Sequence, residues 1–159
     1  MRFLERIGIV GFYLAWPAFF VYLSRSERTR VIIVCQGKVL VVRNWLSDGR
    51  WSLPGGGLHK GEDPRLGAIR ELFEETGIRI ESDHLIELGT GRWQLHGLGY
   101  TFRSYVVCLD TEPQLHRQHI EISRLVWKQA NELTPRQTSP DVLMSLAMLK
   151  TQHPDFLIQ

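Results

Sequence analysis

Three glutamates, Glu71, Glu74 and Glu75, stand within the six-residue run Arg-Glu-Leu-Phe-Glu-Glu that begins at Arg70. On a helix, residues three and four positions apart share a face, so these carboxylates crowd together. Their repulsion disfavours the helix by roughly 0.2–0.5 kcal/mol per pair unless a cation lies among them. Oxygen ligands without cysteine or histidine select hard divalent cations such as Mg²⁺ or Mn²⁺. Taken alone, the run is better explained by a solvated acidic face in which Arg70 pairs with Glu74.

The neighbouring residues predict the helix that must hold these glutamates. Apolar side chains recur at helical spacing at Leu66, Ile69, Leu72 and Phe73. Gly77 supplies a C-terminal stop. The apolar face lies opposite the carboxylates, so its burial would keep the acidic face in place. A glycine-rich loop at residues 55–57 precedes the helix, and glycines let a backbone turn tightly and approach a ligand closely.

The glycines and the helix together form a longer pattern. From Gly56 to Ile78 the sequence reads Gly-x5-Glu-x7-Arg-Glu-Leu-x-Glu-Glu-x-Gly-Ile, which matches the Nudix box at all nine specified positions. Residues 51–56, Trp-Ser-Leu-Pro-Gly-Gly, also look like the segment that leads into the box in that family. The chain therefore resembles the Nudix hydrolase family from about Arg30 to Lys150. This match outweighs the interpretation of the glutamates as a solvated face.

The resemblance implies a role for each position of the box. The implied metal ligands are three carboxylates and one main-chain oxygen, those of Glu71, Glu74, Glu75 and Gly55. Arg70 is expected to fix a glutamate through a charge-assisted hydrogen bond, and Glu62 to buttress the loop or join the metal network. In the hydrolysis that the resemblance implies, a glutamate must also accept the proton of the water that attacks phosphorus. Both a box glutamate and Glu121, from a later loop, are candidates for that role.

The implied reaction is hydrolysis, with Mg²⁺ or Mn²⁺, of a pyrophosphate bond in a nucleoside diphosphate linked to another moiety. The alternative is a non-catalytic Nudix module that binds a nucleotide as a sensor or scaffold. Such modules commonly lose box glutamates, whereas all three are present here. The proline expected after the box for ADP-ribose hydrolysis is absent from residues 92–94. Nucleoside triphosphates, sugar nucleotides and lipid-linked diphosphates stay open as substrates.

Three residues outside the helix are candidates for binding a small nucleotide-like substrate. Lys60 follows the glycines and could touch a phosphate, although a solvated loop is the simpler interpretation. Trp93 could stack on a base, and Arg103 could grip a phosphate. Aromatic residues in strands, however, belong to the core more often than to a binding site.

The remaining patterns predict an α/β fold around the box. Strand-like runs are expected at residues 31–35, 39–42, 99–109 and 125–128. The first two enclose Gln36-Gly37-Lys38, a hairpin turn containing glycine. Ser139-Pro140-Asp141 opens a final helix. These elements indicate a layered α/β domain. The resemblance implies the Nudix α/β/α sandwich with a mixed β-sheet, here preceded by a hydrophobic N-terminal helix.

Length and composition suit one Nudix domain, residues 30–159, after a hydrophobic segment at residues 1–29. A chain of 159 residues can bury one substantial core. The formal net charge of +2 is too small to indicate nucleic-acid binding, so no nucleic-acid partner is expected. Cys35 and Cys108 lie in apolar strand-like runs and are expected to be buried, reduced thiols. A disulfide framework or a zinc site would need more cysteines.

The segment from Ile7 to Leu23 contains seventeen residues without a charge. As a helix it would extend about 25 Å, slightly less than a hydrocarbon core of ~30 Å. Because the run shows no polar face, a membrane anchor or membrane-surface helix is the favoured interpretation. A cleaved signal peptide and a helix packed on the domain or a partner are the alternatives. If the segment spans a membrane, the arginines after it place the catalytic domain in the cytoplasm, tethered to the inner face.

Overall fold

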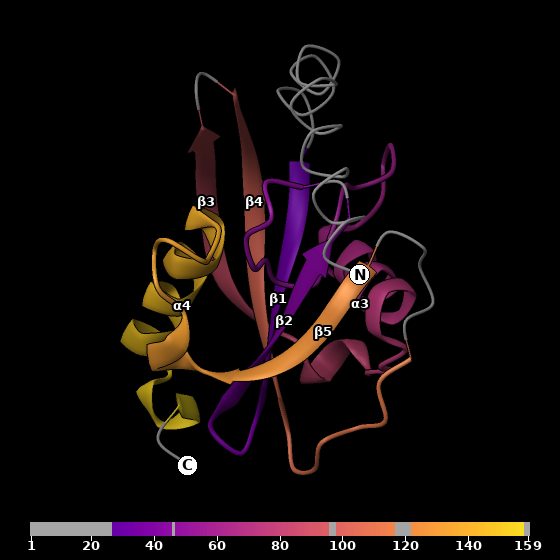
Figure 1. Ribbon diagram of the computed structural model, residues 1–159. Helices are drawn as coiled ribbons and strands as arrows, with labels where there is room; N and C mark the ends of the chain where they lie inside the picture. Colours follow the sequence, from indigo (N-terminus) through magenta and orange to yellow (C-terminus); the bar gives the residue numbers. More distant parts are fainter. Residues whose placement is uncertain (1–26, 46, 96–97, 117–121, 158–159) are drawn as a thin grey trace.

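The computed structural model describes residues 27–45, 47–95, 98–116 and 122–157 (Figure 1). The hydrophobic segment at residues 7–23 and the candidate Glu121 lie outside these ranges. Within the described ranges, no helix has the length and apolar character needed to cross a bilayer.

Five strands form one sheet in the order β3-β4-β1-β2-β5 (Figure 1). The strands are β1 (Glu27–Cys35), β2 (Lys38–Asn44), β3 (Ile86–Leu95), β4 (Leu98–Leu109) and β5 (Ile122–Gln129). β1 and β4 are parallel, and the other neighbours are antiparallel, so the predicted mixed sheet is confirmed. The helices are α3 (Pro64–Thr76) and α4 (Pro140–Gln152), with the short 3-10 helices η1 (Ser82–His84), η2 (Ala130–Glu132) and η3 (Pro154–Leu157).

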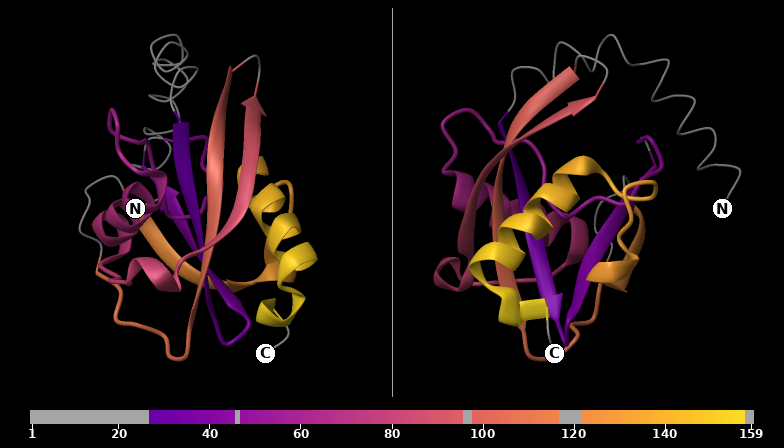
Figure 2. Two further views of the ribbon diagram at one scale, coloured as in Figure 1. Left: turned by 180° about the vertical axis from the view of Figure 1, so that it is seen from behind. Right: turned by 90° about the vertical axis from the view of Figure 1, so that its left-hand side faces the viewer.

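The two helices cover opposite faces of the sheet (Figure 2). Side chains alternate along β1, so Val31 and Ile33 pack on the α3 side and Ile32 and Val34 on the α4 side. All four are buried. This arrangement is the predicted α/β/α sandwich.

β1 and β2 separate beyond their hairpin, and the glycine loop fills the gap between them. The two strands pair only at Val34 with Val39 and at Cys35 with Lys38. Residues 51–58 then run between them. On the β2 side, Val42 and Ser52 exchange two hydrogen bonds of 2.9 Å. On the β1 side, the Thr29 N–H donates to the Gly56 carbonyl at 2.9 Å. The loop is therefore bonded to the sheet much as a strand would be, on the side of β1 away from β4.

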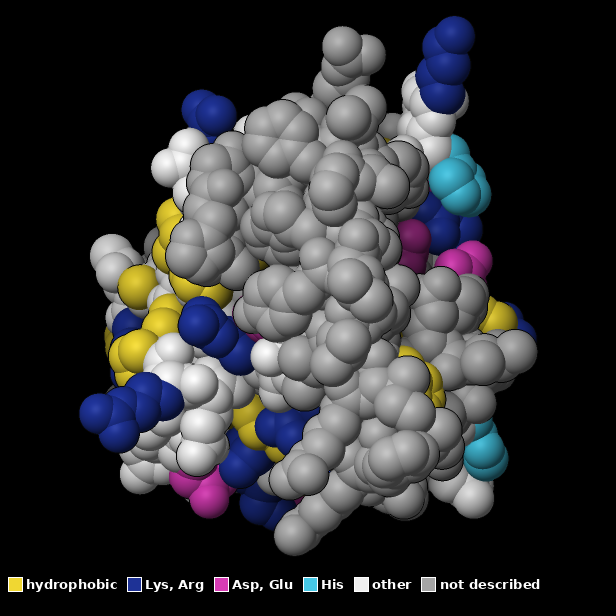
Figure 3. All heavy atoms as spheres, turned by 45° about the horizontal axis from the view of Figure 1, so that its top comes forward, with side chains coloured by type: hydrophobic (Ala, Val, Ile, Leu, Met, Phe, Trp, Pro, Cys, Tyr) yellow, Lys and Arg dark blue, Asp and Glu magenta, His cyan; other side chains and the backbone are white. Residues whose placement is uncertain are grey.

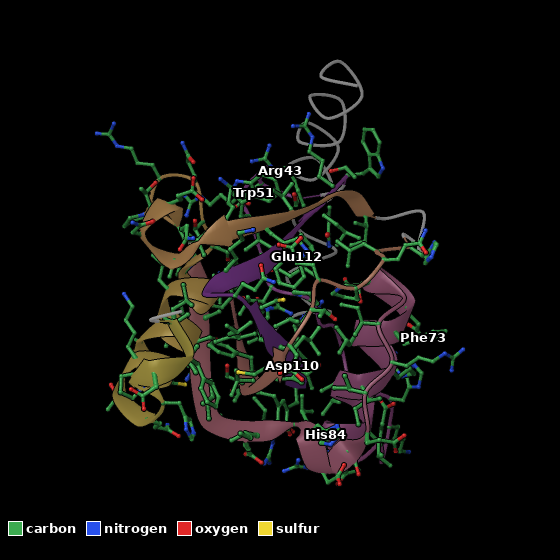
Figure 4. All side chains as sticks on the ribbon, turned by 90° about the horizontal axis from the view of Figure 1, so that it is seen from below. Arg43, Trp51, Phe73, His84, Asp110 and Glu112 are labelled. Atoms are coloured by element: carbon green, nitrogen blue, oxygen red, sulfur yellow. The ribbon has the colours of Figure 1, made fainter. Side chains whose placement is uncertain are left out.

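Helix α3 starts and ends as its sequence predicts. The Asp63 side chain caps its first turn by accepting from two backbone N–H groups, and Gly77 ends it with φ of 77°. The expected apolar face is partly wrong, because Leu66 is 58% exposed. The helix instead turns Ala68 and Leu72 into the core. Phe73 lies on the outer side of α3 (Figure 4). The Arg79 guanidinium stacks on its ring, with Cζ 4.1 Å from the ring centroid.

Two further details differ from the sequence predictions. β3 was not expected, because its glycines at residues 89 and 91 interrupt the usual strand pattern. Cys35 is buried as predicted, whereas Cys108 is exposed. β3 pairs with β4 only as far as Val106, which leaves the last residues of β4 without a neighbour on that side.

Candidate active site

The glycine loop approaches both β1 and α3 more closely than any other residue type would allow. Gly55 has φ of 134°, and a Cβ there would lie 2.3 Å from the Thr29 carbonyl oxygen. A Cβ on Gly56 would lie 2.4 Å from the Glu71 carboxylate. The first glycine therefore permits contact with the sheet, and the second leaves room for an acidic side chain of the helix.

The three box glutamates differ in their surroundings. The Glu74 side chain is 40% exposed and that of Glu71 is largely covered, whereas Glu75 is buried. The Glu75 Oε2 accepts a hydrogen bond of 2.9 Å from the Gly55 N–H. Burial raises the pKa of Glu75 to about 8, although the Gly55 N–H opposes this effect, and the Glu71 charge raises the pKa further. Glu75 therefore meets the loop as a protonated carboxyl group at neutral pH.

Arg70 is the cation that lies among the acidic side chains. Its Nε and Nη2 donate to the two Glu62 oxygens at 2.8 and 2.9 Å. Its Nη1 donates to Glu71 at 2.9 Å and to Glu74 at 3.3 Å. The hydrogen bond from Arg70 and, to a smaller extent, the His59 N–H lower the pKa of Glu62 to about 2 against the effect of burial. Glu62 and Arg70 therefore form a pair that is fully charged at neutral pH and braces the loop against α3.

The described residues contain no three His, Cys, Asp or Glu side chains already gathered for a metal ion. Arg70 bonds to two of the box glutamates, and the third, Glu75, is turned to Gly55. The donor set is nevertheless suitable for a hard divalent cation, because it consists of carboxylate and carbonyl oxygens. The Arg30 and Arg28 charges act on the buried Glu75 carboxyl and lower its pKa, but burial outweighs them. A cation bound beside Glu75 would stabilise its charged form.

A second buried network lies on the other side of the loop. Arg30, on β1, donates from Nη1 to the Thr29 and Gly55 carbonyls at 2.9 and 3.1 Å. Its Nη2 donates to the Tyr100 hydroxyl at 2.6 Å, and its Nε forms an ion pair with Asp141. The Tyr100 hydroxyl in turn donates to Asp141 at 3.1 Å. Burial alone would raise the pKa of Asp141, but the Arg30 charge and the hydrogen bonds from Ser139, Arg30 and Tyr100 together hold that pKa below its ordinary value.

The candidate substrate residues lie in three different settings. Lys60 is exposed in the turn before α3. Trp93 is only 7% exposed, because its ring stacks on Tyr100 with centroids 5.0 Å apart and its Nε1 donates to Ser139. Arg103 forms ion pairs with Glu27 at 2.7 Å and with Glu87. Lys and Arg side chains occupy several separate places on the face shown in Figure 3.

The sequence does not predict that Arg30, Tyr100 and Asp141 share a network. The expected strand begins at Val31, one residue after Arg30, and the sequence pattern predicts for Asp141 only a place at a helix start. The ion pair joins residues 111 positions apart, so no local pattern could have revealed it. The one available signal was an arginine directly before a run of buried β-branched residues.

Comparisons with known proteins agree with this geometry. The NUDIX domain model matches residues 25–146. A MutT-like protein of Streptomyces ambofaciens is 46% identical over 55 residues, which are 35% of this chain and 35% of that protein. An RNA pyrophosphohydrolase of Yersinia enterocolitica is 32% identical over 114 residues, 69% of this chain and 62% of that protein. The matched segments thus span less than two thirds of either relative.

The fold has a close counterpart among solved structures. The crystal structure of a MutT NUDIX hydrolase from Burkholderia pseudomallei superimposes with a TM-score of 0.68 at 20% sequence identity. The superposition covers 78% of this chain and 97% of that one. A complete box folded onto this scaffold, and a family match over most of its length, show that the chain belongs to the Nudix family.

Proposed function

We propose that the chain is a metal-dependent pyrophosphohydrolase that cleaves a pyrophosphate bond in a nucleoside diphosphate linked to another moiety. The observation that carries this proposal is the contact between α3 and the loop. Glu71 lies against Gly56, and the buried Glu75 lies against Gly55. Acidic groups of one helix thus meet a loop whose glycines let the backbone approach closely, which is an arrangement suited to a cation and a phosphate.

The residues that would hold a cation are Glu71, Glu74, Glu75 and the carbonyl of Gly55. When bound, a divalent cation neutralises phosphate charge and lowers the pKa of a coordinated water. Arg70 would release Glu71 and Glu74 to it while keeping Glu62, to which it is bonded through two nitrogens. The Glu62–Arg70 pair would then hold the loop in place throughout the reaction.

Glu74 is the box glutamate most available to a reacting water. Its side chain is the most exposed of the three, and its contact with Arg70, at 3.3 Å, is longer than that of Glu71. We assign it the role of proton acceptor or metal ligand, with Glu121 as the competing acceptor. Lys60 and Arg103 are proposed to contact phosphate groups, and for Arg103 this requires exchange of an acidic partner.

The test is product release from a substrate panel with Mg²⁺ or Mn²⁺, comparing the full chain with Glu74→Gln. The panel contains nucleoside triphosphates, sugar nucleotides and an oligoribonucleotide with a 5′-triphosphate, since one relative is an RNA pyrophosphohydrolase. Glu81→Gln, an exposed glutamate beyond α3, is the matched control. We expect metal-dependent turnover that falls by a factor of ~10² only in Glu74→Gln.

Other outcomes of this experiment point to different functions. Nucleotide binding to a folded chain without turnover of any panel member would favour the sensor or scaffold module. Turnover that survives Glu74→Gln unchanged would place the reaction elsewhere in the molecule. We also propose that residues 7–23 associate with a membrane and hold the domain on its cytoplasmic side, an inference that rests on sequence alone.

A further inference from the structure

The backbone of Gly55 is hydrogen-bonded on one side to the helix α3 and on the other side to the sheet. Its N–H donates to Glu75 of α3, and its carbonyl accepts from Arg30 of β1. With φ of 134° and no room for a Cβ, Gly55 adopts a backbone conformation that other residues rarely reach. The direction of its carbonyl therefore depends on these hydrogen bonds.

Arg30 can hold that carbonyl because Asp141 and Tyr100 hold Arg30. The Asp141 carboxylate is completely buried in the first turn of α4 and forms an ion pair with Nε. Tyr100 accepts from Arg30 and donates to Asp141. Each guanidinium nitrogen therefore has a partner, and the group has one orientation.

We propose that Arg30 and Asp141 are positioning residues that orient the Gly55 carbonyl for the cation, so that the start of α4 helps to build the metal site. This inference rests on the proposed function. Charge supports it as well as geometry. An isolated arginine beside the Gly55 oxygen would repel a cation, whereas Asp141 compensates the Arg30 charge and leaves the carbonyl free to bind through its second lone pair.

The experiment measures Mn²⁺ binding to the full chain from the EPR signal of free Mn²⁺, without substrate. Asp141→Asn should weaken binding by about 10- to 100-fold, the usual effect of losing a partner behind a metal ligand. Tyr100→Phe removes the two hydrogen bonds of the hydroxyl, from Arg30 and to Asp141, without changing charge, and should weaken binding by about three- to tenfold. Arg30→Lys keeps the charge but loses the forked contacts, so it should resemble Asp141→Asn.

Ser145→Ala is the matched control, because Ser145 is buried in α4 and its hydroxyl donates to the backbone oxygen of Asp141, not to its carboxylate. It should leave Mn²⁺ affinity unchanged whatever it does to the melting temperature. If Asp141→Asn proves unfolded, Tyr100→Phe decides the question. Lower melting temperatures with unaltered Mn²⁺ affinity in Tyr100→Phe and Arg30→Lys would overturn the inference and leave a purely structural ion pair.

Failure of the proposed function would look different. A full chain that binds Mn²⁺ in an Asp141-dependent manner, but hydrolyses no member of the substrate panel, would support the positioning role and contradict the activity. If the full chain hydrolyses members of the panel, and Asp141→Asn, Tyr100→Phe and Arg30→Lys all leave its Mn²⁺ affinity unchanged, the activity would be supported and the positioning role contradicted.

Discussion

The Glu75 carboxylate accepts a 2.9 Å hydrogen bond from the backbone N–H of Gly55, which lies 20 positions earlier in the chain. The bond joins the acidic helix to the glycine loop at a place closed to solvent. Because burial raises the pKa of this carboxyl to about 8, it keeps its proton at neutral pH while no cation is bound. The hydrogen bond between α3 and the glycine loop is thus made by a carboxyl group, that of Glu75, whose charge depends on pH.

Glu75→Gln should change how the stability of the metal-free chain depends on pH. The folded pKa of about 8 lies above the ordinary 4.5, so the contribution of Glu75 is fully present below pH 4.5 and is lost as pH rises through 8. Each unit of pKa difference corresponds to about 1.4 kcal/mol. We expect the unfolding free energy of the wild type, measured with urea in the presence of EDTA, to fall relative to that of Glu75→Gln as pH rises from 5 to 8. Parallel curves for the two proteins would refute the buried, protonated state.

Glu62→Gln should show the opposite dependence. The bond to Arg70 lowers the pKa of Glu62 to about 2, so its contribution is present above pH 4.5 and is lost as pH falls towards 2. We expect the variant to unfold more easily than the wild type at pH 7, and the difference in unfolding free energy to shrink as pH falls from 4.5 towards 2. Glu112→Gln, which breaks the exposed pair with Lys38, should change stability by less than about 1 kcal/mol at any pH. A Glu62→Gln effect that persists undiminished at pH 2 would contradict this assignment.

The parts of the site that the sequence could predict are those encoded by neighbouring residues. Helix α3 has an Asp cap, a proline in its first turn and a glycine at its end, and each acts within a few residues. The β1–β2 hairpin follows equally from Gln36 and Gly37, which both have positive φ. The acidic face of the helix needs only the spacing of its glutamates.

What the sequence could not show depends on contacts between distant segments. The glycine loop lies in the gap between β1 and β2, and nothing in residues 51–58 says which strands will bond to it. Asp141 reads as an ordinary residue of a helix start until the fold brings Arg30 to it. Leu66 fits the apolar period of α3, yet its side chain is 58% exposed. Such outcomes are decided by tertiary packing and not by local preference.

Deletion of residues 1–24 should separate membrane association from the rest of the molecule. The first described strand, β1, begins at Glu27, so the deletion leaves every described element intact. We expect the full chain to sediment with anionic lipid vesicles, and the truncated chain to remain in the supernatant with the same melting temperature. Sedimentation of both proteins, or of neither, would show that residues 7–23 do not mediate membrane association.

Alanine at the two neighbouring glycines should separate stability from activity. At Gly55, where φ is 134°, the new Cβ would lie 2.3 Å from the Thr29 carbonyl oxygen. Relief of this clash would require the backbone of β1 or of the loop to move. Gly55→Ala should therefore lose several kcal/mol of unfolding free energy. At Gly56 the three atoms nearest to the new Cβ all belong to the end of the flexible Glu71 side chain. Gly56→Ala should stay within about 1 kcal/mol of the wild type because Glu71 can swing away.

The same displacement should remove Glu71 from the loop, and with it a ligand of the proposed metal site. We expect Gly56→Ala to melt near the wild-type temperature but to lose turnover by a factor of ~10². The double variant Gly56→Ala, Glu71→Ala should be no less active than Gly56→Ala, because the glutamate is already misplaced. If Gly56→Ala instead retains full turnover, Glu71 does not act from its position against the loop, and the metal site must be built without it.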